Sequence, residues 1–309
     1  MSEGHGYGKV ILFNEHFVVH MIPAIASAID KKTVATVRDS DKGEFVLSDD
    51  RPETPGYKKE KLSQQKDSLD RIFNTMDLAN KKDSLELTLG GDLLCATGLG
   101  ASAASCTATA RALSDHFGLN YSLEEINNVA YEGEKGYHGT PSGLDNTAAT
   151  YGGVIWFKRG DDGVMEKLNL KNPVEVVIAN TGIVGDTTAA VSGVRERKEK
   201  YQEKYKKLFK SAEEMVFEAR KALESGDIKR VGELMNENHT LLQGIEVSSK
   251  ELDMLVGIAR DNGAIGAKMT GGGLGGNILA LTPGEELQEE VANAIESKGF
   301  SVIRTSVGV

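Results

Sequence analysis

The chain has 309 residues, of which 39% are hydrophobic and 27% are charged. This length exceeds what one hydrophobic core usually serves, so we expect two domains. The formal net charge is −10 and no basic run is present, which argues against nucleic acid or an anionic membrane as a partner. Two cysteines cannot form a disulfide framework, and no apolar stretch approaches the roughly 20 residues of a membrane span, so we expect a cytoplasmic protein.

The N-terminal half mixes predicted strands with helices. Apolar and β-branched patterns predict strands at 10–13, 33–38, 84–89 and 153–157. Helical spacing predicts a helix at 68–78, and small residues predict a closely packed helix at 101–117. A capping box of Ser122 and Glu125 opens a further helix at 122–133. The polar segment 39–67 is expected to be an exposed excursion with room for one hairpin.

The C-terminal half changes character near residue 170. A buried strand is expected at 174–179, followed by a long charged helical stretch at 186–225 and helices at 228–242 and 248–262. Strands at 264–269, 277–281 and 300–305 then alternate with a helix at 285–298. This order is typical of a ferredoxin-like α+β half. We therefore predict an α+β protein with domains at 1–170 and 171–309.

A glycine-rich turn feeds directly into the helix predicted at 101–117. Such a turn places unpaired backbone N–H groups at the positive end of a helix dipole, where phosphate binds. Hydroxyls on the first turn could bind a phosphate oxygen or Mg²⁺. A tight helix start that needs small residues explains the same pattern equally well. The residues concerned are Gly98, Leu99, Gly100, Ala101, Ser102, Ala103, Ala104 and Ser105.

A second glycine-rich segment, 270–276, contains Gly271, Gly272 and Gly273. It matches the dinucleotide pattern G-x-G-x-x-G, but a strand and not a helix is expected after it, so a Rossmann site is excluded. We interpret it as backbone that passes close to a ligand. More generally, 19 of the 35 glycines gather at 4–8, 98–100, 133–153, 182–193 and 271–276, and we interpret these clusters as ligand-facing loops.

Two further segments carry side chains suited to catalysis. The run 134–146 is rich in turn residues and holds Glu134 and Asp145; if the loop folds back, one carboxylate could hold a metal ion while the other accepts a proton. The plain alternative is a polar loop in which Asp145 caps a helix. The strand at 10–13 carries Lys9 before it and Glu15 and His16 after it. His16 and His20 have no third ligand nearby, which argues against a metal pair.

Together these four segments resemble the GHMP small-molecule kinases from about residue 6 to 305. Within that superfamily, the stretches 15–19, 138–146 and 180–195 are similar to the mevalonate kinases of archaeal and bacterial type. The resemblance implies a two-domain GHMP kinase fold, with a ribosomal protein S5 domain 2-like N-terminal half and a ferredoxin-like C-terminal half. It also implies phosphoryl transfer from MgATP to the C5 hydroxyl of (R)-mevalonate.

The resemblance assigns a role to each site residue. Asp145 would be the general base, with Lys9 beside it to offset developing charge. Ser102 and Glu134 would hold Mg²⁺, and residues 98–105 together with Gly271, Gly272 and Gly273 would bind the nucleotide. Glu15, His16 and Thr187 would line the mevalonate side together with Lys9 and Asp145. Mevalonate and ATP would be the partners, with no nucleic acid and no membrane, in a monomer or a homodimer, the dimer being favoured.

Three residues depart from the family pattern: Tyr7 stands for proline, Asn14 for glycine and Ala101 for serine. Asparagine tolerates positive φ better than most residues, so we expect the turn at Asn14 to form. Ala101 keeps its backbone N–H, so we expect the turn at 98–105 still to bind phosphate. Two alternatives stay open: a GHMP kinase for phosphomevalonate, a sugar or homoserine, and a non-catalytic nucleotide-binding member.

Overall fold

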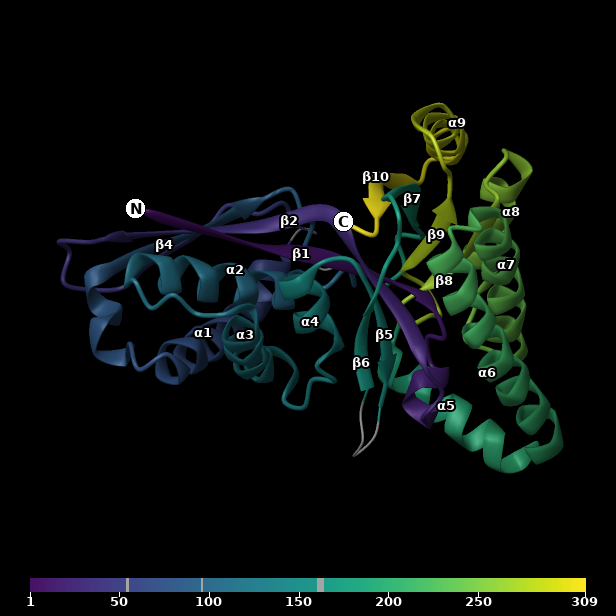
Figure 1. Ribbon diagram of the computed structural model, residues 1–309, viewed down its shortest axis with the longest axis horizontal. Coiled ribbons are helices and arrows are strands. Elements are labelled where there is room, and N and C mark those ends of the chain that lie inside the picture. The colour runs from purple at the N-terminus through teal and green to yellow at the C-terminus, as the bar shows by residue number, and fades with distance from the viewer. Residues whose placement is uncertain (54–55, 96, 160–163) are drawn as a thin grey trace. The chain divides into compact units, whose positions relative to one another are not determined.

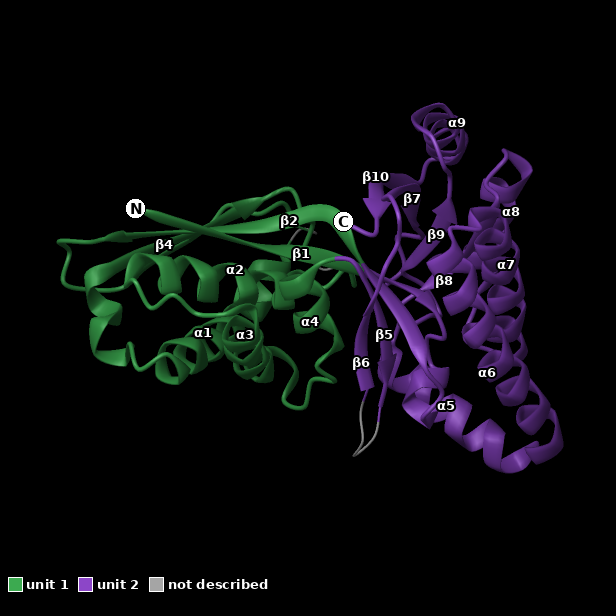
Figure 2. Ribbon diagram, in the orientation of Figure 1, with its two compact units in different colours: residues 1–9, 28–152 green, residues 10–27, 153–309 purple. Residues whose placement is uncertain are grey.

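The computed structural model describes residues 1–53, 56–95, 97–159 and 164–309 (Figure 1). The chain forms two compact units, and each unit is built from two stretches of sequence (Figure 2). Unit 1 comprises residues 1–9 and 28–152, and unit 2 comprises residues 10–27 and 153–309. A domain boundary near residue 170 stays a prediction; the compact units change after residue 152, and residues 10–27 join the C-terminal part.

Unit 1 contains a sheet whose strands are longer than the sequence indicates. β1 (Ser2–Phe13) pairs with β2 (Ala24–Asp39), which runs antiparallel to β4 (Leu85–Gly91). β3 (Val46–Asp49) lies parallel to β4, so the 39–67 segment joins the sheet instead of forming a hairpin. The alternation predicted at 84–89 is confirmed, because Leu85, Leu87 and Leu89 are all buried.

Four helices cover one face of this sheet (Figure 1): α1 (Tyr57–Thr75), α2 (Ala101–His116), α3 (Leu123–His138) and α4 (Leu144–Tyr151). Leucines of β4 pack there against Ile72 and Phe73 of α1, Leu113 of α2 and Val129 of α3. The capping box of Ser122 and Glu125 forms as predicted. A short 3₁₀ helix (Ala79–Ser84) leads into β4.

Helix α2 packs closely against β1, as its small residues predict. A Cβ atom added to Gly6 would lie 2.2 Å from the carbonyl oxygen of Ala104, and one added to Gly4 would lie 2.3 Å from that of Ala108. Only glycine fits at such a distance from another backbone. The glycine cluster at 4–8 therefore contributes to helix packing here, and its interpretation as a ligand-facing loop is wrong for Gly4 and Gly6.

Unit 2 contains a four-stranded antiparallel sheet in the order β10-β7-β9-β8. Its strands are β7 (Val174–Asn180), β8 (Gly266–Thr270), β9 (Asn277–Leu281) and β10 (Ser301–Val307). This is the ferredoxin-like half that the element order predicts. A hairpin of β5 (Val154–Lys158) and β6 (Val164–Leu168) joins the unit, with β5 antiparallel to residues 24–27 of β2.

Five α-helices complete the described part of unit 2, together with the 3₁₀ turn Phe17–His20. The charged stretch 186–225 is two helices, α5 (Thr187–Lys200) and α6 (Gln202–Ser225), because Tyr201 leaves the helical conformation at φ −120° and ψ 55°. Helices α7 (Ile228–Gly244) and α8 (Lys250–Asp261) contact β8, and α9 (Glu285–Glu296) contacts β7 and β10.

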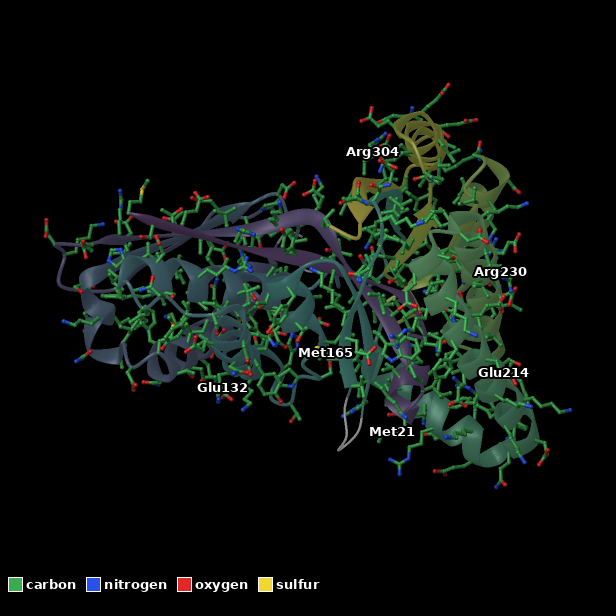
Figure 3. All side chains as sticks on the ribbon, viewed as in Figure 1. Met21, Glu132, Met165, Glu214, Arg230 and Arg304 are labelled. Atoms are coloured by element: carbon green, nitrogen blue, oxygen red, sulfur yellow. The ribbon has the colours of Figure 1, made fainter. Side chains whose placement is uncertain are left out.

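Charged side chains cover the outer faces of these helices (Figure 3). Arg230, for example, forms ion pairs with Glu218, Glu233 and Glu237 at 2.9–3.1 Å. Both cysteines, Cys95 and Cys106, are buried free thiols of unit 1. Among the described residues, no helix has the length and apolar character needed to span a membrane.

Candidate active site

The glycine-rich segment before α2 has the geometry of an anion-binding helix start. Gly98 and Gly100 adopt left-handed conformations, with φ of 72° and 77°, and α2 begins directly after them. The backbone N–H of Lys9 donates to the carbonyl of Leu99 at 2.8 Å, and a Cβ atom on Gly100 would lie 2.9 Å from Lys9 Cγ. Glycine is therefore required where this turn approaches Lys9.

Lys9 and Asp145 form an ion pair within unit 1. Lys9 Nζ lies 3.1 Å from Asp145 Oδ1, and the aspartate side chain is one-third exposed. Asp145 occupies the first turn of α4, whose N-cap is Gly143, so it does not cap this helix. Asn146 anchors the turn by donating to Asn127 Oδ1 at 2.8 Å. The 134–146 loop thus folds back as the sequence analysis requires.

Glu134, on the last turns of α3, is the most perturbed carboxyl group of this cluster. Burial, followed by the charge of Asp145, raises the pKa of Glu134 to about 8. Ser102 hydrogen-bonds this carboxyl group, and Glu134 Oε1 is buried without a hydrogen-bond partner among the described residues. A buried carboxylate oxygen beside a hydroxyl is the donor set that a hard cation such as Mg²⁺ prefers. The residues present therefore fit the ion that the resemblance implies.

His138 is a member of this cluster that the sequence analysis did not identify as a site residue. Its Nε2 lies 3.2 Å from Ser102 Oγ and 4.0 Å from Glu134 Oε2. The available signal was its spacing, since residues four apart on a helix share a face. Within the described ranges, no group of three or more His, Cys, Asp or Glu side chains forms a complete metal site.

A second group of candidate residues lies in unit 2, at the turn after β1. Asn14 and His16 have positive φ, 70° and 61°, which is uncommon for residues other than glycine. Asn14 holds the turn by donating to the carbonyls of Pro23 at 2.8 Å and Ala212 at 3.1 Å. The expectation that asparagine would accept a left-handed conformation here is confirmed.

His16 and Thr187 meet at Gly272 of the second glycine-rich segment. His16 Nε2 lies 2.9 Å from the carbonyl oxygen of Gly272, and a Cβ atom on Gly272 would lie 2.0 Å from Thr187 Oγ1. Burial lowers the pKa of His16, which favours a neutral ring that donates through Nε2 to this carbonyl. His16 Nδ1 is buried and accepts no hydrogen bond within the described chain.

Glu15 points into the interior of unit 2, where it pairs with Lys268. Both side chains are fully buried, and Lys268 also donates to the carbonyl of Met269 at 2.6 Å. Burial raises the pKa of Glu15 and lowers that of Lys268, and their mutual attraction opposes both shifts. A direct contact between Glu15 and mevalonate stays a prediction. Lys268 is a second residue that sequence reasoning missed; its signal was a lone lysine within the apolar strand at 264–269.

The remaining glycines divide into loop and packing positions. Gly271 and Gly273 have φ of 88° and 76° in the turn between β8 and β9, and a Cβ atom on Gly273 would lie 2.2 Å from the carbonyl oxygen of Val247. Their predicted contact with nucleotide stays a prediction. Gly136 of α3 instead lies against the backbone of α1. The interpretation of the 133–153 glycines as ligand-facing is therefore wrong for Gly136.

Two family models match the chain, the GHMP kinases N terminal domain at 67–153 and the GHMP kinases C terminal domain at 219–301. A mevalonate kinase of Pyrococcus abyssi is 34% identical, covering 97% of this chain and 93% of its own length. One from Aeropyrum pernix is also 34% identical, covering 94% of this chain and 91% of its own length.

Solved structures of mevalonate kinases also resemble this chain. The L. major mevalonate kinase in complex with R-mevalonate matches with a TM-score of 0.94 and 37% identity, over 99% of this chain and 96% of that one. The Methanococcus jannaschii mevalonate kinase matches with a TM-score of 0.82 and 25% identity, over 99% and 98%. Identity above 30% across nearly the whole chain, with both family models in order, shows that this chain belongs to the mevalonate kinases of the GHMP kinase family.

Proposed function

We propose that this chain transfers the γ-phosphoryl group of ATP to the C5 hydroxyl of (R)-mevalonate, giving 5-phosphomevalonate and ADP. The observation that carries the proposal is the Lys9–Asp145 ion pair beside the glycine-rich start of α2, in a chain that belongs to the mevalonate kinases. The backbone N–H groups at 98–104 would bind the β- and γ-phosphates, since the first turn of a helix leaves them without intrahelical partners.

In this mechanism, Asp145 accepts the proton of the C5 hydroxyl while the C5 oxygen forms a bond to the γ-phosphorus of ATP. The bond between the γ-phosphorus and the oxygen that bridges it to the β-phosphate breaks, and ADP leaves. The Lys9 ammonium, 3.1 Å from the carboxylate, offsets the charge that develops on the reacting oxygens. Phosphoryl transfer through a loose transition state depends mainly on positioning and on neutralising charge, and both residues supply this.

Ser102 and Glu134 would hold Mg²⁺, which when bound offsets the charge of the β- and γ-phosphates. The unpartnered Oε1 of Glu134 and the adjacent hydroxyl of Ser102 support this assignment. On the acceptor side, His16, Thr187 and Glu15 would bind mevalonate. His16 Nδ1 has no hydrogen-bond partner among the described residues, and Thr187 lies against Gly272. Ser105 would act indirectly, because its hydroxyl donates to the carbonyl of Ser102 at 2.8 Å. Gly271, Gly272 and Gly273 would contribute to nucleotide binding.

We also propose a cytoplasmic enzyme that works as a monomer or a homodimer, with the dimer favoured. Two buried cysteines without a disulfide support a reducing compartment.

The acceptor is tested by measuring ADP release with mevalonate, 5-phosphomevalonate, galactose and homoserine, and by locating the new phosphate by NMR. Mevalonate is expected to give the highest kcat/KM, with phosphate on C5. Faster turnover of another acceptor would assign the chain to a different GHMP kinase, and ATP binding without turnover of any of them would favour a non-catalytic member.

The base is tested with Asp145→Asn. We expect kcat to fall by roughly 10²–10⁴-fold, the usual contribution of a general base, while ATP binding is nearly unchanged. Asp30→Asn is a matched control, because Asp30 forms an exposed ion pair with Lys32 at 3.4 Å. A kcat for Asp145→Asn close to that of the control would exclude the base assignment.

The proposed Mg²⁺ role of Ser102 is tested with Ser102→Ala, which should weaken binding of the Mg²⁺–nucleotide complex.

A further inference from the structure

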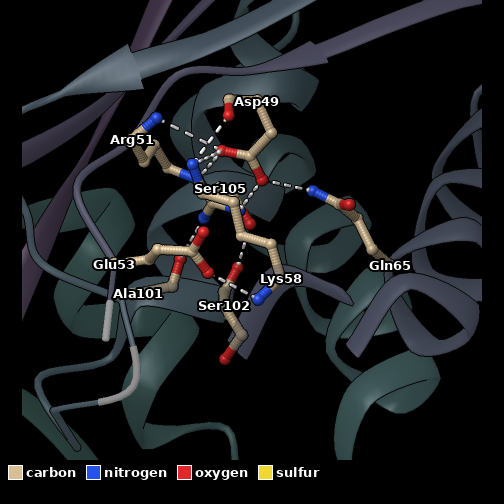
Figure 4. A network of polar contacts seen from close by, with 8 residues as sticks. All are labelled: Asp49, Arg51, Glu53, Lys58, Gln65, Ala101, Ser102 and Ser105. Carbon is tan, nitrogen blue, oxygen red and sulfur yellow. Dashed lines mark hydrogen bonds and ion pairs between the residues drawn. The ribbon is translucent and has the colours of Figure 1, made fainter. Parts of the chain in front are cut away.

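Arg51 lies in a buried polar cluster directly behind the first turn of α2 (Figure 4). Its side chain is only 5% exposed, although it carries a full charge. Nε and Nη2 donate to the two carboxylate oxygens of Asp49 at 2.8 and 2.6 Å, and Nη1 donates to the carbonyl of Ala101 at 3.3 Å. One guanidinium therefore links the end of β3 to the first residue of α2.

Asp49 is itself held by hydrogen bonds from other residues, so the carboxylate that binds the guanidinium has a fixed position. Gln65 of α1 donates to Asp49 Oδ2 at 2.7 Å, and Lys58 donates to the carbonyl of Asp49 at 2.7 Å. Burial raises the pKa of Asp49, but the hydrogen bonds from Arg51 and Gln65, together with the charges of Arg51 and Lys58, outweigh it. The net effect lowers the pKa of Asp49 and keeps its carboxylate ionised. A bidentate arginine–carboxylate pair of this kind fixes orientation as well as position.

The groups that this cluster holds belong to the proposed phosphate site. Arg51 contacts the carbonyl of Ala101, and Ser105 contacts that of Ser102, the next residue. Two successive carbonyls of the first turn are thus oriented by side chains, and this also orients the N–H groups that face the other way along the helix.

The electrostatics favour a role in anion binding over stability alone. A buried cation at the N-terminus of a helix lies at the positive end of the helix dipole, which is unfavourable without an anion nearby. Among the residues that the structure describes, Asp49 is the carboxylate that pairs with this charge, while Lys58 and Lys61 line the same pocket beside Ala101 and Ser102. A bound phosphate would add an attractive interaction both with the guanidinium and with the positive end of the helix.

We propose that Arg51 is a positioning residue for the nucleotide: by holding the first turn of α2 against Asp49, it aligns the N–H groups and Ser102 for the phosphates of ATP without touching the nucleotide. This inference rests on the proposed phosphate site at 98–105. It also gives a function to the 39–67 segment, which supplies both partners of the bidentate pair.

The test compares Arg51→Met and Arg51→Lys with wild type, using calorimetric titration of MgADP and steady-state kinetics. Arg51→Met should weaken MgADP binding and raise KM for ATP by about tenfold, the effect of losing a charge-assisted hydrogen bond, while KM for mevalonate is unchanged. Arg51→Lys keeps the charge but not the bidentate contact, so its MgADP affinity and its KM for ATP should lie between those of wild type and Arg51→Met. Arg71→Met is a matched control, since Arg71 pairs with Asp67 on the exposed face of α1.

Equal changes in the two KM values, or none in either, for a folded Arg51→Met would overturn the proposal. If Arg51→Met does not fold, Arg51→Lys decides, and wild-type MgADP affinity in that variant would overturn the proposal as well. Failure of wild type to bind MgADP would instead reject the phosphate site itself, a result that the variants alone cannot produce.

Discussion

The Glu15–Lys268 pair shows how much a single buried contact can determine. The two residues lie 253 positions apart in sequence, and neither side chain reaches solvent. Removing one partner leaves an uncompensated charge in the interior, whereas replacing both with apolar residues removes the desolvation penalty together with the attraction.

Lys268→Met should therefore lower the free energy of unfolding by about 3–5 kcal/mol. The double variant Glu15→Leu/Lys268→Met should recover at least half of that loss. Urea unfolding of both variants and of wild type measures the difference. Equal stability of the single and double variants would show that the pair is not coupled.

His239 of α7 predicts a pH-dependent contribution to stability. Burial, partly opposed by Asp253 at 3.1 Å, lowers the pKa of His239 from 6.5 to about 4. The unfolded state therefore binds the extra proton first, so stability is fully present above pH 6.5 and falls as the pH is lowered toward 4. The shift corresponds to about 3 kcal/mol.

In His239→Asn, the amide oxygen can replace Nδ1 as the acceptor for the N–H of Met269, which now lies 3.3 Å away. This variant should lose less stability than wild type between pH 7 and pH 4.5, by roughly 2 kcal/mol. Urea unfolding at several pH values gives both curves. Parallel curves for the two proteins would contradict the assignment.

At the scale of elements, the sequence predicted most helices and strands but not where the longest ones begin. Helix α1 starts at Tyr57 and not at residue 68, because its first two turns are mostly exposed and carry no apolar periodicity. β1 extends back to Ser2 through alternating glycines that have no strand signal and are explained only by the approach of α2.

In the candidate site too, features with a local sequence signal could be predicted, whereas those that depend on distant contacts could not. Loops with special backbone requirements, such as 98–100 and 271–276, are visible as glycine clusters, and the Lys9–Asp145 pair follows from the motifs. Arg51 could not be identified, and Lys268 stood out only as a lone lysine in an apolar strand, because nothing in a single sequence says which distant carboxylate a basic residue meets.

Two glycines inside helices should respond oppositely to alanine. A Cβ atom on Gly136 of α3 would lie 2.4 Å from the backbone nitrogen of Ser68, whereas one on Gly257 of α8 would meet nothing within 4 Å. Gly136→Ala should lower stability by about 1–3 kcal/mol through overpacking. Gly257→Ala should raise it by up to about 1 kcal/mol through helix propensity. Thermal unfolding of both variants tests this, and a loss of stability in each would contradict the packing argument.

At the scale of the whole molecule, each compact unit carries a different part of the proposed chemistry. The proposed phosphate-binding segment, the proposed base and the proposed Mg²⁺ ligands lie in unit 1. Glu15, His16 and Thr187, which are proposed to bind mevalonate, lie in unit 2 with the second glycine-rich segment. The N-terminal family model ends at residue 153, one residue after unit 1 ends. Residues 10–27 are the exception, because this early segment brings Glu15 and His16 into unit 2.

The two buried thiols give unit 1 a chemical reporter of its own. Cys95 and Cys106 are the only cysteines of the chain, both lie in unit 1, and burial raises the pKa of each. Alkylation requires an accessible thiolate, so iodoacetamide should label native protein far more slowly than unfolded chain. The labelling rate then measures the opening of unit 1 alone, and MgADP should slow it in proportion to its occupancy. Labelling at the rate of a free thiol would mean that unit 1 opens readily without its nucleotide.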